Sequence, residues 1–537
     1  MDDKQSSEHS ENENHSKMIG RRGFIVTLGF GVAASALLRK LPGKSTEGIP
    51  KVSSEKISLA STTTSTSLPG VSTSLNNEEL SNEVETVFET VISGGRVIDP
   101  DSGFDGIANI GINGDSIRLV SNSPLTGNSE IDATGLVVAP GFIDVLSYPT
   151  NGYGEWYKIA DGVTSNLCMH GIDNPMEKFL ENTKAHNPPV NYGGAVDHYQ
   201  HRKILKVGIQ RTTEKERRTL LERAETDLQA GAIGIHQQPE YTVELQKSEI
   251  VDHGHLAAKY NVPLCLHLRH SYDKAFGSQE NAINEALEVA KETGCSIHIE
   301  HLNSTGGTGR MRAAIDQIEK ARDEGLAITA CIYPYIFWAT YGGSARFDNF
   351  QEKYDISFGD LQEVGKPDRM TEETFSIARG ENKLIAAYAM DEEDVTEALS
   401  APWVLIGSDS ILEKPEKDEN HNNHPRSTGC FSHLLSKYVR EQKVLSLSDA
   451  LAKITILPAQ LLEKSSSSMN LRGRIQSGAV ADITMFDPEN ISDQSDVSNP
   501  AQESVGIIHV MVGGQLARSN NRNNNVQSGV PILRDIS

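Results

Sequence analysis

A (β/α)8 barrel of the TIM type, joined to a small β domain, is the fold that the sequence predicts. Eight short apolar segments alternate with helical segments between about residues 137 and 409. Short β segments broken by Gly, Asn and Asp flank this region on both sides. The length of 537 residues also exceeds what one hydrophobic core sustains, so more than one domain is expected. A doubly wound sheet is the rival fold, but polar residues end many strands instead of gathering at one switch point.

Residues 1–40 are predicted to be a twin-arginine-type export signal. Arg21 and Arg22 precede an apolar run from Phe24 to Leu38, which is too short for an ordinary membrane span. The paired arginines resemble a twin-arginine signal, which implies export of a folded chain. We expect a periplasmic or extracellular protein, or a membrane-tethered one if the signal stays uncleaved. A chance apolar helix is the alternative.

The next segments are a linker and the first part of the small β domain. Residues 41–88 are rich in Ser and Thr, as in STTTSTSLPGVSTS, and cannot bury enough apolar surface to offset their ordering entropy. A disordered linker is therefore predicted. Beyond it, VISGGRVIDP and later GRIQSGAVADITMFDP both read as short β segments broken by Gly and Asp. We assign 89–139 together with 466–537 to the small β domain, and 140–465 to the barrel.

The barrel strands are predicted from eight apolar runs in chain order. They are VVAPGFIDV, VTSNLCMH, VNYGGAV, AIGIH, VPLCLHL, SIHIEHL, LAITACIYP and WVLIGSD. Segments between them are predicted helices, for example ERRTLLERAETDLQAG and ENAINEALEVAKETG. Each of these ends in Gly, a common helix stop.

Composition excludes some classes of partner. The formal net charge is −23, with 50 Lys and Arg against 73 Asp and Glu. An acidic surface argues against nucleic acid and against anionic membranes, leaving the signal segment as the only predicted membrane contact. The five cysteines are scattered, so they do not indicate a disulfide framework.

Polar residues end several predicted strands, where barrel enzymes carry their functional groups. His267 ends strand five, His301 ends strand six and Asp409 ends strand eight. Neutral imidazoles and a carboxylate suit Zn²⁺, which polarises an amide carbonyl. A nearby Asp can accept a proton from water and pass it to the leaving nitrogen. These three residues therefore form a candidate set for amide hydrolysis.

Successive side chains of a β-strand point to opposite faces, which predicts which residues of strand six face the barrel interior. Ile297, Ile299 and His301 share one face, so His298 and Glu300 are expected to point the other way. We predict that His301 points inward and that His298 is structural.

Strand two offers a further ligand. Cys168 and His170 share a face, and either is a candidate. A thiolate suits Zn²⁺, whereas a buried Cys without a metal is the alternative for Cys168.

The chain from about Val91 to Ala517 resembles the amidohydrolase superfamily, specifically the N-acyl-D-amino-acid deacylase group. The matching motifs are SGGRVIDPDSG, VVAPGFIDV, ADGVTS, LHLRH, HIEHLNSTG, IYPY, IGSD, HPRSTGCFSHLLSKYVRE, LSLSDALAKITILPAQLLE and LRGRIQSGAVADITMFDP. NYGGAVDH, HLNSTG and HPRSTG are most similar to the N-acyl-D-glutamate deacylase branch.

The resemblance implies a barrel with a small β-sandwich and zinc-dependent removal of an N-acyl group from a D-amino acid. It implies that His267 and His301 are metal ligands and that Asp409 is the catalytic acid/base. The implied substrate-side residues are Arg269, Tyr333, Tyr335, His424 and Arg426. An acyl amino acid is a small molecule with a free carboxylate, which basic or phenolic groups can bind. A salt-bridged residue at the barrel rim is the alternative for Arg269.

The stretch APGFIDVLSYP departs from the family pattern. Family members carry a His-x-His pair after GFID, and the pair aligns here with Leu146 and Tyr148. The site that depends on this pair is therefore predicted to be missing or weakened.

Two outcomes remain open from this departure. In one, a single Zn²⁺ or other divalent ion is held by His267, His301 and either Cys168 or His170, beside Asp409. In the other, no metal binds and the barrel is a degenerate enzyme that acts as an exported ligand-binding protein. A dipeptidase or cyclic amidase would suit the same site, because a fold does not fix a substrate.

Overall fold

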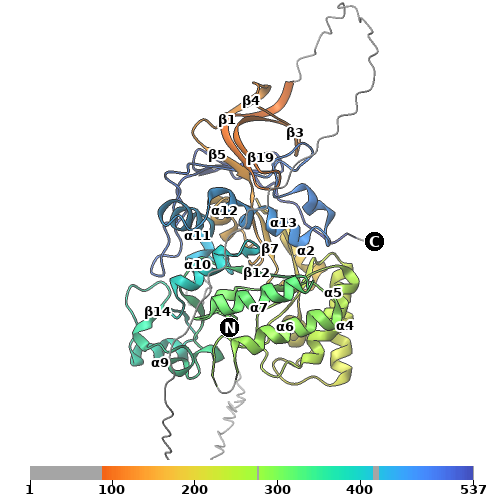
Figure 1. Cartoon of the computed structure of the whole chain (residues 1–537), viewed down its shortest axis with the longest axis vertical. Helices are drawn as coiled ribbons and strands as arrows, with labels where there is room; N and C mark the ends of the chain where they lie inside the picture. The colour runs from red at the N-terminus through yellow and green to blue at the C-terminus, as the bar shows by residue number, and fades with distance from the viewer. Residues whose placement is uncertain (1–86, 275–276, 415–422, 536–537) are drawn as a thin grey trace, which may run out of the picture. The chain divides into compact units, whose positions relative to one another are not determined.

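The protein is described by a computed structural model that covers residues 87–274, 277–414 and 423–535. Eight parallel strands form one sheet in the order β16-β12-β11-β10-β9-β8-β7-β6. Figure 1 labels two of them, β7 and β12. Their bounds are Phe142–Asp144 (β6), Val163–Cys168 (β7), Asn191–Asp197 (β8), Gly234–Gln237 (β9), Leu264–Leu266 (β10), Ile297–Ile299 (β11), Ile328–Ile332 (β12) and Val404–Ile406 (β16). All eight predicted strands are present. The predicted signal and nearly all of the predicted linker lie outside the described residues.

Hydrogen bonds bring the two end strands of this sheet together. Ser408 N, just after β16, donates to Asp144 Oδ1 of β6 at 3.0 Å. Asp409 N donates to Leu146 O at 2.6 Å. The sheet therefore curls into a nearly closed barrel, as the sequence predicts.

Side chains of alternate strand residues fill the barrel interior. Ile143, Leu167, Cys265, Cys331 and Leu405 belong to one buried cluster drawn from five strands. Their strand neighbours on the opposite face pack against the surrounding helices. The interior is thus a packed core, and a pocket opens beyond the strand ends.

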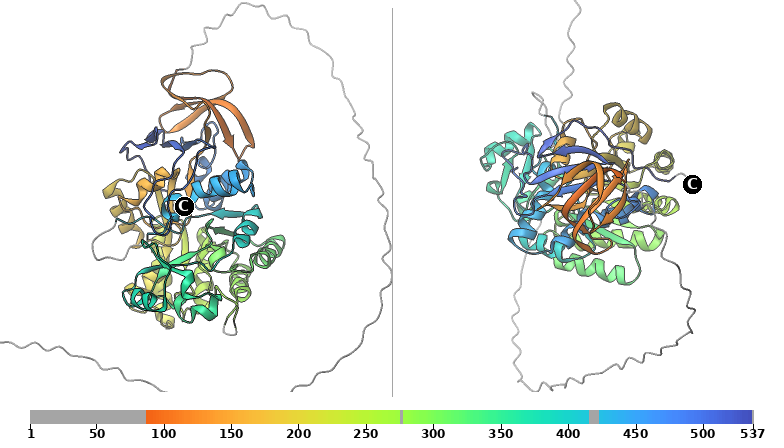
Figure 2. Two further views of the ribbon diagram at one scale, coloured as in Figure 1. Left: turned by 90° about the vertical axis from the view of Figure 1, so that its left-hand side faces the viewer. Right: turned by 90° about the horizontal axis from the view of Figure 1, so that it is seen from above.

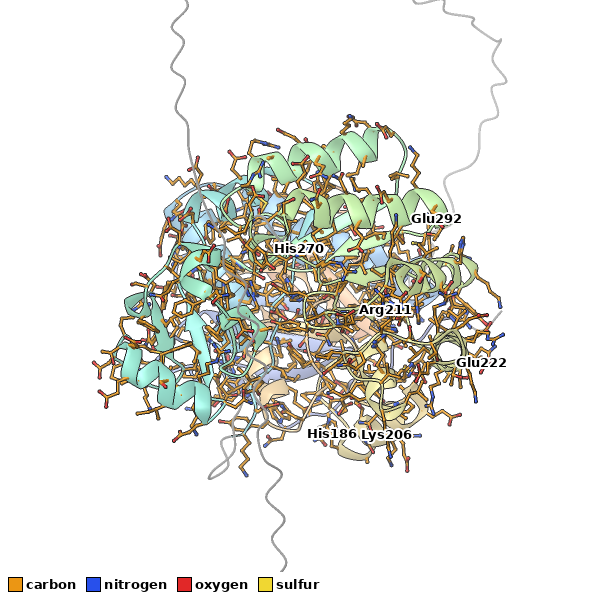
Figure 3. The ribbon with its side chains drawn as sticks, turned by 90° about the horizontal axis from the view of Figure 1, so that it is seen from below. His186, Lys206, Arg211, Glu222, His270 and Glu292 are labelled. Atoms are coloured by element: carbon orange, nitrogen blue, oxygen red, sulfur yellow. The ribbon has the colours of Figure 1, made fainter. Side chains whose placement is uncertain are left out.

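Helices cover the outer face of the barrel. Their bounds are Gly154–Ala160 (α1), Met176–His186 (α2), His198–Ile204 (α3), Glu214–Gln229 (α4), Lys247–Tyr260 (α5), Gln279–Thr293 (α6), Met311–Asp323 (α7), Glu392–Ser400 (α10), Arg426–His433 (α11), Leu447–Ile454 (α12) and Ile456–Leu462 (α13). A capping box between Thr213 and Glu216 starts α4, and Gly294 with φ 71° ends α6. Glu222 of α4 and Glu292 of α6 lie on the exposed side (Figure 3).

A second sheet is built from both ends of the described chain. It contains Val87–Asp99 (β1), Phe104–Asn113 (β2), Ser116–Ser121 (β3), Thr126–Asp132 (β4), Val137–Pro140 (β5), Ile483–Phe486 (β17), Ile507–Val512 (β18), Gln515–Ser519 (β19) and Arg522–Asn523 (β20). Strand β5 pairs with β1 on one side and with β17 on the other. Figure 2 shows these N-terminal (orange) and C-terminal (dark blue) strands side by side. The separate β domain formed from both ends is confirmed.

An insertion between the seventh and eighth barrel strands was not predicted. It contains the antiparallel strands Trp338–Tyr341 (β13), Leu361–Glu363 (β14) and Leu384–Ala387 (β15), and the helices Phe350–Tyr354 (α8) and Glu372–Gly380 (α9). These strands are only three or four residues long, too short for a recognisable period. The insertion matters because it carries pocket residues, including Trp338 and Arg346.

None of the helices in the described ranges is long and apolar enough to cross a membrane. The five cysteines are all buried and unpaired.

Candidate active site

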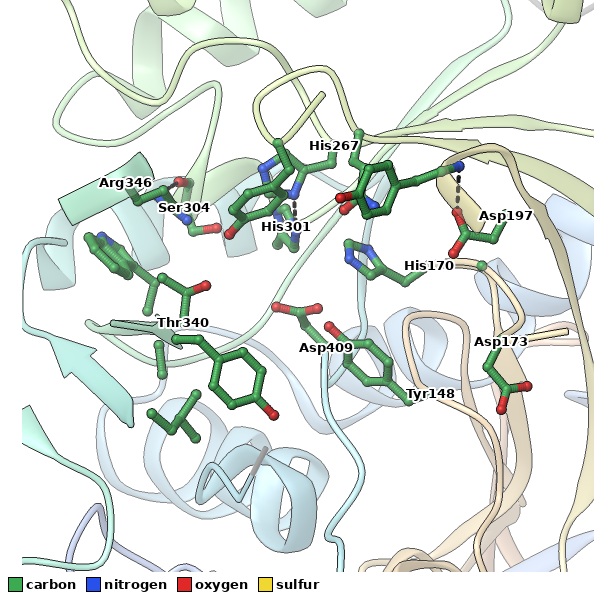
Figure 4. Close-up of a pocket in the computed structure, with 18 of the residues that line it drawn as sticks. Tyr148, His170, Asp173, Asp197, His267, His301, Ser304, Thr340, Arg346 and Asp409 are labelled. Carbon is green, nitrogen blue, oxygen red and sulfur yellow. Dashed lines mark hydrogen bonds between the residues drawn. The ribbon is translucent and has the colours of Figure 1, made fainter. Parts of the chain in front are cut away.

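A pocket of about 370 Å³ opens where the barrel strands end. His170, His267 and His301 form one part of its lining. Figure 4 shows these three rings directed toward one another, with Asp409 and Tyr148 on the facing side. Residues that follow five different strands therefore meet in one cavity.

Three of the pocket histidines, His170, His267 and His301, can hold a metal ion together with a fourth, fully buried side chain. This fourth side chain is Glu300, and one donor atom from each of the four lies within 4.8 Å of the others. His267 Nδ1 is 3.1 Å from His301 Nε2. His170 Nδ1 is 2.7 Å from Glu300 Oε2. Imidazoles with a carboxylate are a donor set that suits Zn²⁺ and similar divalent ions.

Glu300 belongs to this cluster, contrary to the expectation that it points away from His301. Strand β11 ends at Ile299, so period two does not extend to the residues that follow. His301 adopts a positive φ of 28°, a strained conformation for a residue other than Gly. The chain turns there, and both Glu300 and His301 reach the same cluster. His298 pairs in register with Cys265 of the barrel interior.

His170 and Cys168 are separated by the end of strand two. Cys168 is the last residue of β7, lies in the cluster that packs against the helices, and is absent from the metal-binding group. Burial raises the pKa of its thiol well above the ordinary value, which disfavours the thiolate. His170 lies in the turn beyond the strand and reaches the cluster. Of the two candidates, the structure therefore brings only His170 to the site.

The four side chains of the cluster differ in their protonation states at pH 7. Burial lowers the pKa of His301 to about 3 and also lowers that of His267, so both are neutral imidazoles at pH 7. Burial alone would lower the pKa of His170, but the Glu300 carboxylate raises it to about 9. Burial would raise the pKa of Glu300, but the adjacent His236 and His170 hold it well below the ordinary value. Glu300 is therefore an ionised carboxylate that pairs with a protonated His170, while the other two imidazoles of the cluster are neutral.

Glu240 and Arg346 support His267 from its other side, and the sequence did not indicate either residue. Glu240 Oε2 lies 2.8 Å from His267 Nε2 and 3.7 Å from Arg346 Nε. Arg346 also donates to Ser304 O at 2.7 Å and stacks over the Trp338 ring at 4.2 Å. A carboxylate on the distal nitrogen fixes the orientation of an imidazole ligand. The insertion thereby contributes to the geometry of the site.

Asp409 is held by an arginine. Arg426 Nη2 donates to Asp409 Oδ2 at 2.7 Å, and the Arg426 guanidinium lies 4.3 Å from the centre of the Tyr333 ring. Burial would raise the pKa of Asp409, but Arg426, His301 and His170 lower it. The residue has a positive φ of 51° and follows strand β16. It therefore presents an ionised carboxylate to the pocket.

The five predicted substrate-side residues separate into two groups. Tyr333 and Arg426 line the pocket, whereas Arg269, Tyr335 and His424 are not part of its lining. Arg269 donates two 2.9 Å hydrogen bonds to the Glu285 carboxylate. It is therefore the salt-bridged residue that was the alternative to a substrate-binding role. Glu285 comes from α6, and this pairing cannot be read from local sequence.

Tyr335 and His424 lie behind the pocket and stack on other rings. Tyr335 stacks on His433 with ring centres 4.6 Å apart. His424 stacks on Phe337 at 4.8 Å and accepts a 3.0 Å bond from Arg426 N. These contacts give both residues a place in the packing beneath Arg426.

Strand one contributes no member of the metal-binding group. Leu146 is fully buried in the barrel core. It packs closely against Gly407, since a Cβ atom added to Gly407 would lie 2.5 Å from the Leu146 Cβ. Tyr148 lines the pocket, with its ring centre 5.5 Å from that of His170. An apolar side chain and a phenol thus stand at the two positions where the resemblance implies a pair of histidines.

Comparisons with known proteins find one family model and several relatives to which this chain is similar. The amidohydrolase family model matches residues 361–518. N-acyl-D-glutamate deacylase of Alcaligenes xylosoxydans xylosoxydans is 28% identical over 473 residues, covering 80% of this chain and 93% of that protein. D-aminoacylase of the same organism is 25% identical, covering 80% of this chain and 94% of that protein.

Solved structures show the same fold. N-acyl-D-glutamate deacylase from Bordetella bronchiseptica, complexed with zinc and a phosphonate inhibitor, matches with a TM-score of 0.72 at 24% identity over 84% of this chain and 100% of that chain. A D-aminoacylase structure described by the role of its binuclear metal centre, with one-metal activation and second-metal attenuation, matches with a TM-score of 0.72 at 23% identity over 83% of this chain and 100% of that chain.

Proposed function

We propose that this chain, which contains an amidohydrolase-family domain, is a metal-dependent hydrolase that removes the N-acyl group of an N-acyl-D-amino acid. The observation that carries the proposal is the convergence of three imidazoles, a carboxylate and Asp409 at the open end of the barrel. Similarity to N-acyl-D-glutamate deacylase and D-aminoacylase over 80% of the chain supports the substrate class.

A single divalent ion, most simply Zn²⁺, fits the donors present. His170, His267 and His301 would hold it, since two of the three are neutral and all are buried or nearly so. A bound ion of this kind polarises the amide carbonyl of the substrate. Strand one supplies no donors for a second ion, so we propose one metal per chain.

Asp409 is the proton carrier. Its Oδ2 is held by Arg426, while its Oδ1 has no hydrogen-bond partner among the described residues. The free oxygen of an ionised carboxylate accepts a proton from the attacking water and returns it to the leaving nitrogen. The lowered pKa keeps Asp409 ionised at neutral pH, so its carboxylate is in the form that can accept a proton.

Arg426 positions the substrate carboxylate. Its Nη1 also has no partner among the described residues, and its guanidinium is buried beside Tyr333 in the pocket. A charge-assisted bond from a buried guanidinium fits the free carboxylate of an acyl amino acid. The acyl amide is thereby oriented toward the His cluster and Asp409.

The proposal is tested by hydrolysis of N-acetyl-D-glutamate and N-acetyl-L-glutamate, each with added Zn²⁺ and with a chelator. We expect metal-dependent release of the D-amino acid. The missing strand-one pair favours one competing function, a degenerate barrel that binds ligands without turnover. Binding of the D-substrate with no release of product would support that alternative. Metal-dependent release of product from a dipeptide or a cyclic amide, but not from the acyl amino acid, would move the assignment to a dipeptidase or cyclic amidase.

We also propose that the chain is exported through its N-terminal segment. Arg21 and Arg22 before the apolar run support this proposal.

A further inference from the structure

We propose that Glu300 is itself a metal ligand, so that strands two, five and six hold the ion through three histidines and one carboxylate, and that His236 fixes this carboxylate from behind. This inference rests on the proposed metal-dependent function and names the donor that compensates for strand one.

The Glu300 side chain is completely buried, and among the described residues its carboxylate has hydrogen bonds to imidazoles alone. His170 Nδ1 lies 2.7 Å from one carboxylate oxygen, and His236 Nδ1 lies 2.9 Å from the other. No lysine or arginine forms an ion pair with it among the described residues. A buried carboxylate requires a compensating charge, which a divalent cation supplies.

Two other carboxylates close to the histidine cluster are each paired with an arginine. Asp409 is paired with Arg426 at 2.7 Å, and Glu240 is paired with Arg346 at 3.7 Å. Glu300 differs from both, because its carboxylate pairs with imidazoles instead of an arginine and belongs to the metal-binding group of the described residues. Without it, a dication would be held by imidazoles alone in a buried site.

The spacing of the donors agrees with shared coordination. Ligand atoms about 2.0–2.2 Å from a tetrahedral Zn²⁺ lie roughly 3.4 Å from one another. The pair His267 Nδ1 and His301 Nε2 is 3.1 Å apart, and the pair His170 Nδ1 and Glu300 Oε2 is 2.7 Å apart. All four donors fall within 4.8 Å, so small side-chain movements bring them around one ion.

His236 completes the arrangement as a positioning residue. It lies within β9, the fourth barrel strand, is fully buried and is not part of the pocket lining. Its ring centre lies 4.4 Å from that of His170, while its Nδ1 contacts Glu300. Groups that hold a ligand in this way are typically worth about 10–100-fold in metal affinity.

The test compares Zn²⁺ affinity, by chelator competition, and the visible absorption of the Co²⁺-substituted protein in the full chain and its variants. Glu300→Gln keeps the size of the side chain and removes its charge. We expect its Zn²⁺ affinity to fall at least 100-fold and its Co²⁺ bands to change. We expect His236→Gln to lower the affinity by about 10–100-fold. Glu155→Gln is the matched control, since Glu155 is a buried carboxylate paired with His186 at 3.2 Å outside the pocket lining.

Unchanged affinity and bands in Glu300→Gln, with one metal still bound, would overturn this inference and leave the proposed function intact. A parent chain that binds no metal would overturn both. If Glu300→Gln does not fold, a crystal structure of the Zn²⁺-loaded parent decides the matter. We expect a Glu300 oxygen about 2.0–2.2 Å from the ion, whereas a distance beyond about 3 Å would contradict the proposal.

Discussion

Arg426 anchors one oxygen of the Asp409 carboxylate at 2.7 Å and leaves the other without a partner among the described residues. The arginine both lowers the pKa of the acid and fixes its orientation. A carboxylate arranged in this way can accept and return a proton without moving, which is the role proposed for it.

Replacing this acid tests the role directly. We expect Asp409→Asn to retain its metal and to lose turnover by about 10²–10⁴-fold, because an amide cannot accept the proton. Metal content and kcat for an N-acyl-D-amino acid are the measurements. A variant with a near-normal kcat would remove Asp409 from the mechanism.

Lys158 ties together the two ends of the barrel sheet. Its Nζ lies 2.7 Å from Asp144 Oδ2 and from Ser408 Oγ, and both charged side chains are at most 1% exposed. Lys158→Met leaves a buried carboxylate without its partner, so we expect the free energy of unfolding to fall by about 3–5 kcal/mol. Lys178→Met, which removes an exposed ion pair with Glu181, is the control and should change stability little. Equal unfolding midpoints for the two variants in urea would contradict this account.

The helical layer contains a histidine that makes stability depend on pH. Burial, followed by the charge of His198, lowers the pKa of His253 to about 3. In the unfolded chain the same group titrates near 6.5, so below that pH the unfolded state binds a proton that the folded state does not. The stabilisation is complete above about pH 6.5 and is lost as the pH falls toward 3.

The measurement is the free energy of unfolding between pH 7 and 4. We expect His253→Asn, whose amide can replace Nδ1 in its 2.8 Å bond to Glu249 O, to show a slope smaller by up to about 1.4 kcal/mol per pH unit. The exposed His255 of the same helix provides the control, and His255→Asn should retain the parental slope. Identical slopes for all three proteins would show that His253 does not titrate as described.

Export is predicted to depend on the arginine pair. Replacing Arg21-Arg22 with Lys-Lys should block export, since the twin-arginine route reads that pair. The matched control is Arg39→Lys, which makes the same change outside the pair and should leave export unchanged. Fractionation of cells that express each form measures the outcome. Export of the Lys-Lys form at the parental level would point to another route.

The barrel could be predicted from sequence because its strands are buried on both faces and read as apolar runs, as in SIHIEHL and WVLIGSD. The site was less predictable where a strand stops. Period two holds through Ile299, and the turn at His301 then brings Glu300 to the same cluster. On strand two, Cys168 faces the helices and His170 reaches the site only because it lies beyond the strand end.

Contacts between distant segments could not be predicted at all. The pairing of Glu240 with Arg346 joins the end of strand four to the insertion after strand seven. Arg269 is engaged by Glu285 of α6, which removes it from the pocket. Such pairs depend on tertiary packing, and no local period or motif encodes them.

The measurement that tests the account most directly is the metal content of the purified full chain, by elemental analysis, from cells supplied with zinc. The account predicts about one tightly held metal ion per chain, and none in His301→Ala. A parent chain without metal, or His301→Ala with unchanged metal content, would contradict it. The replacement of two histidines by Leu146 and Tyr148 would then mark the loss of a metalloenzyme, whereas one bound ion shows a site rebuilt on strands two, five and six.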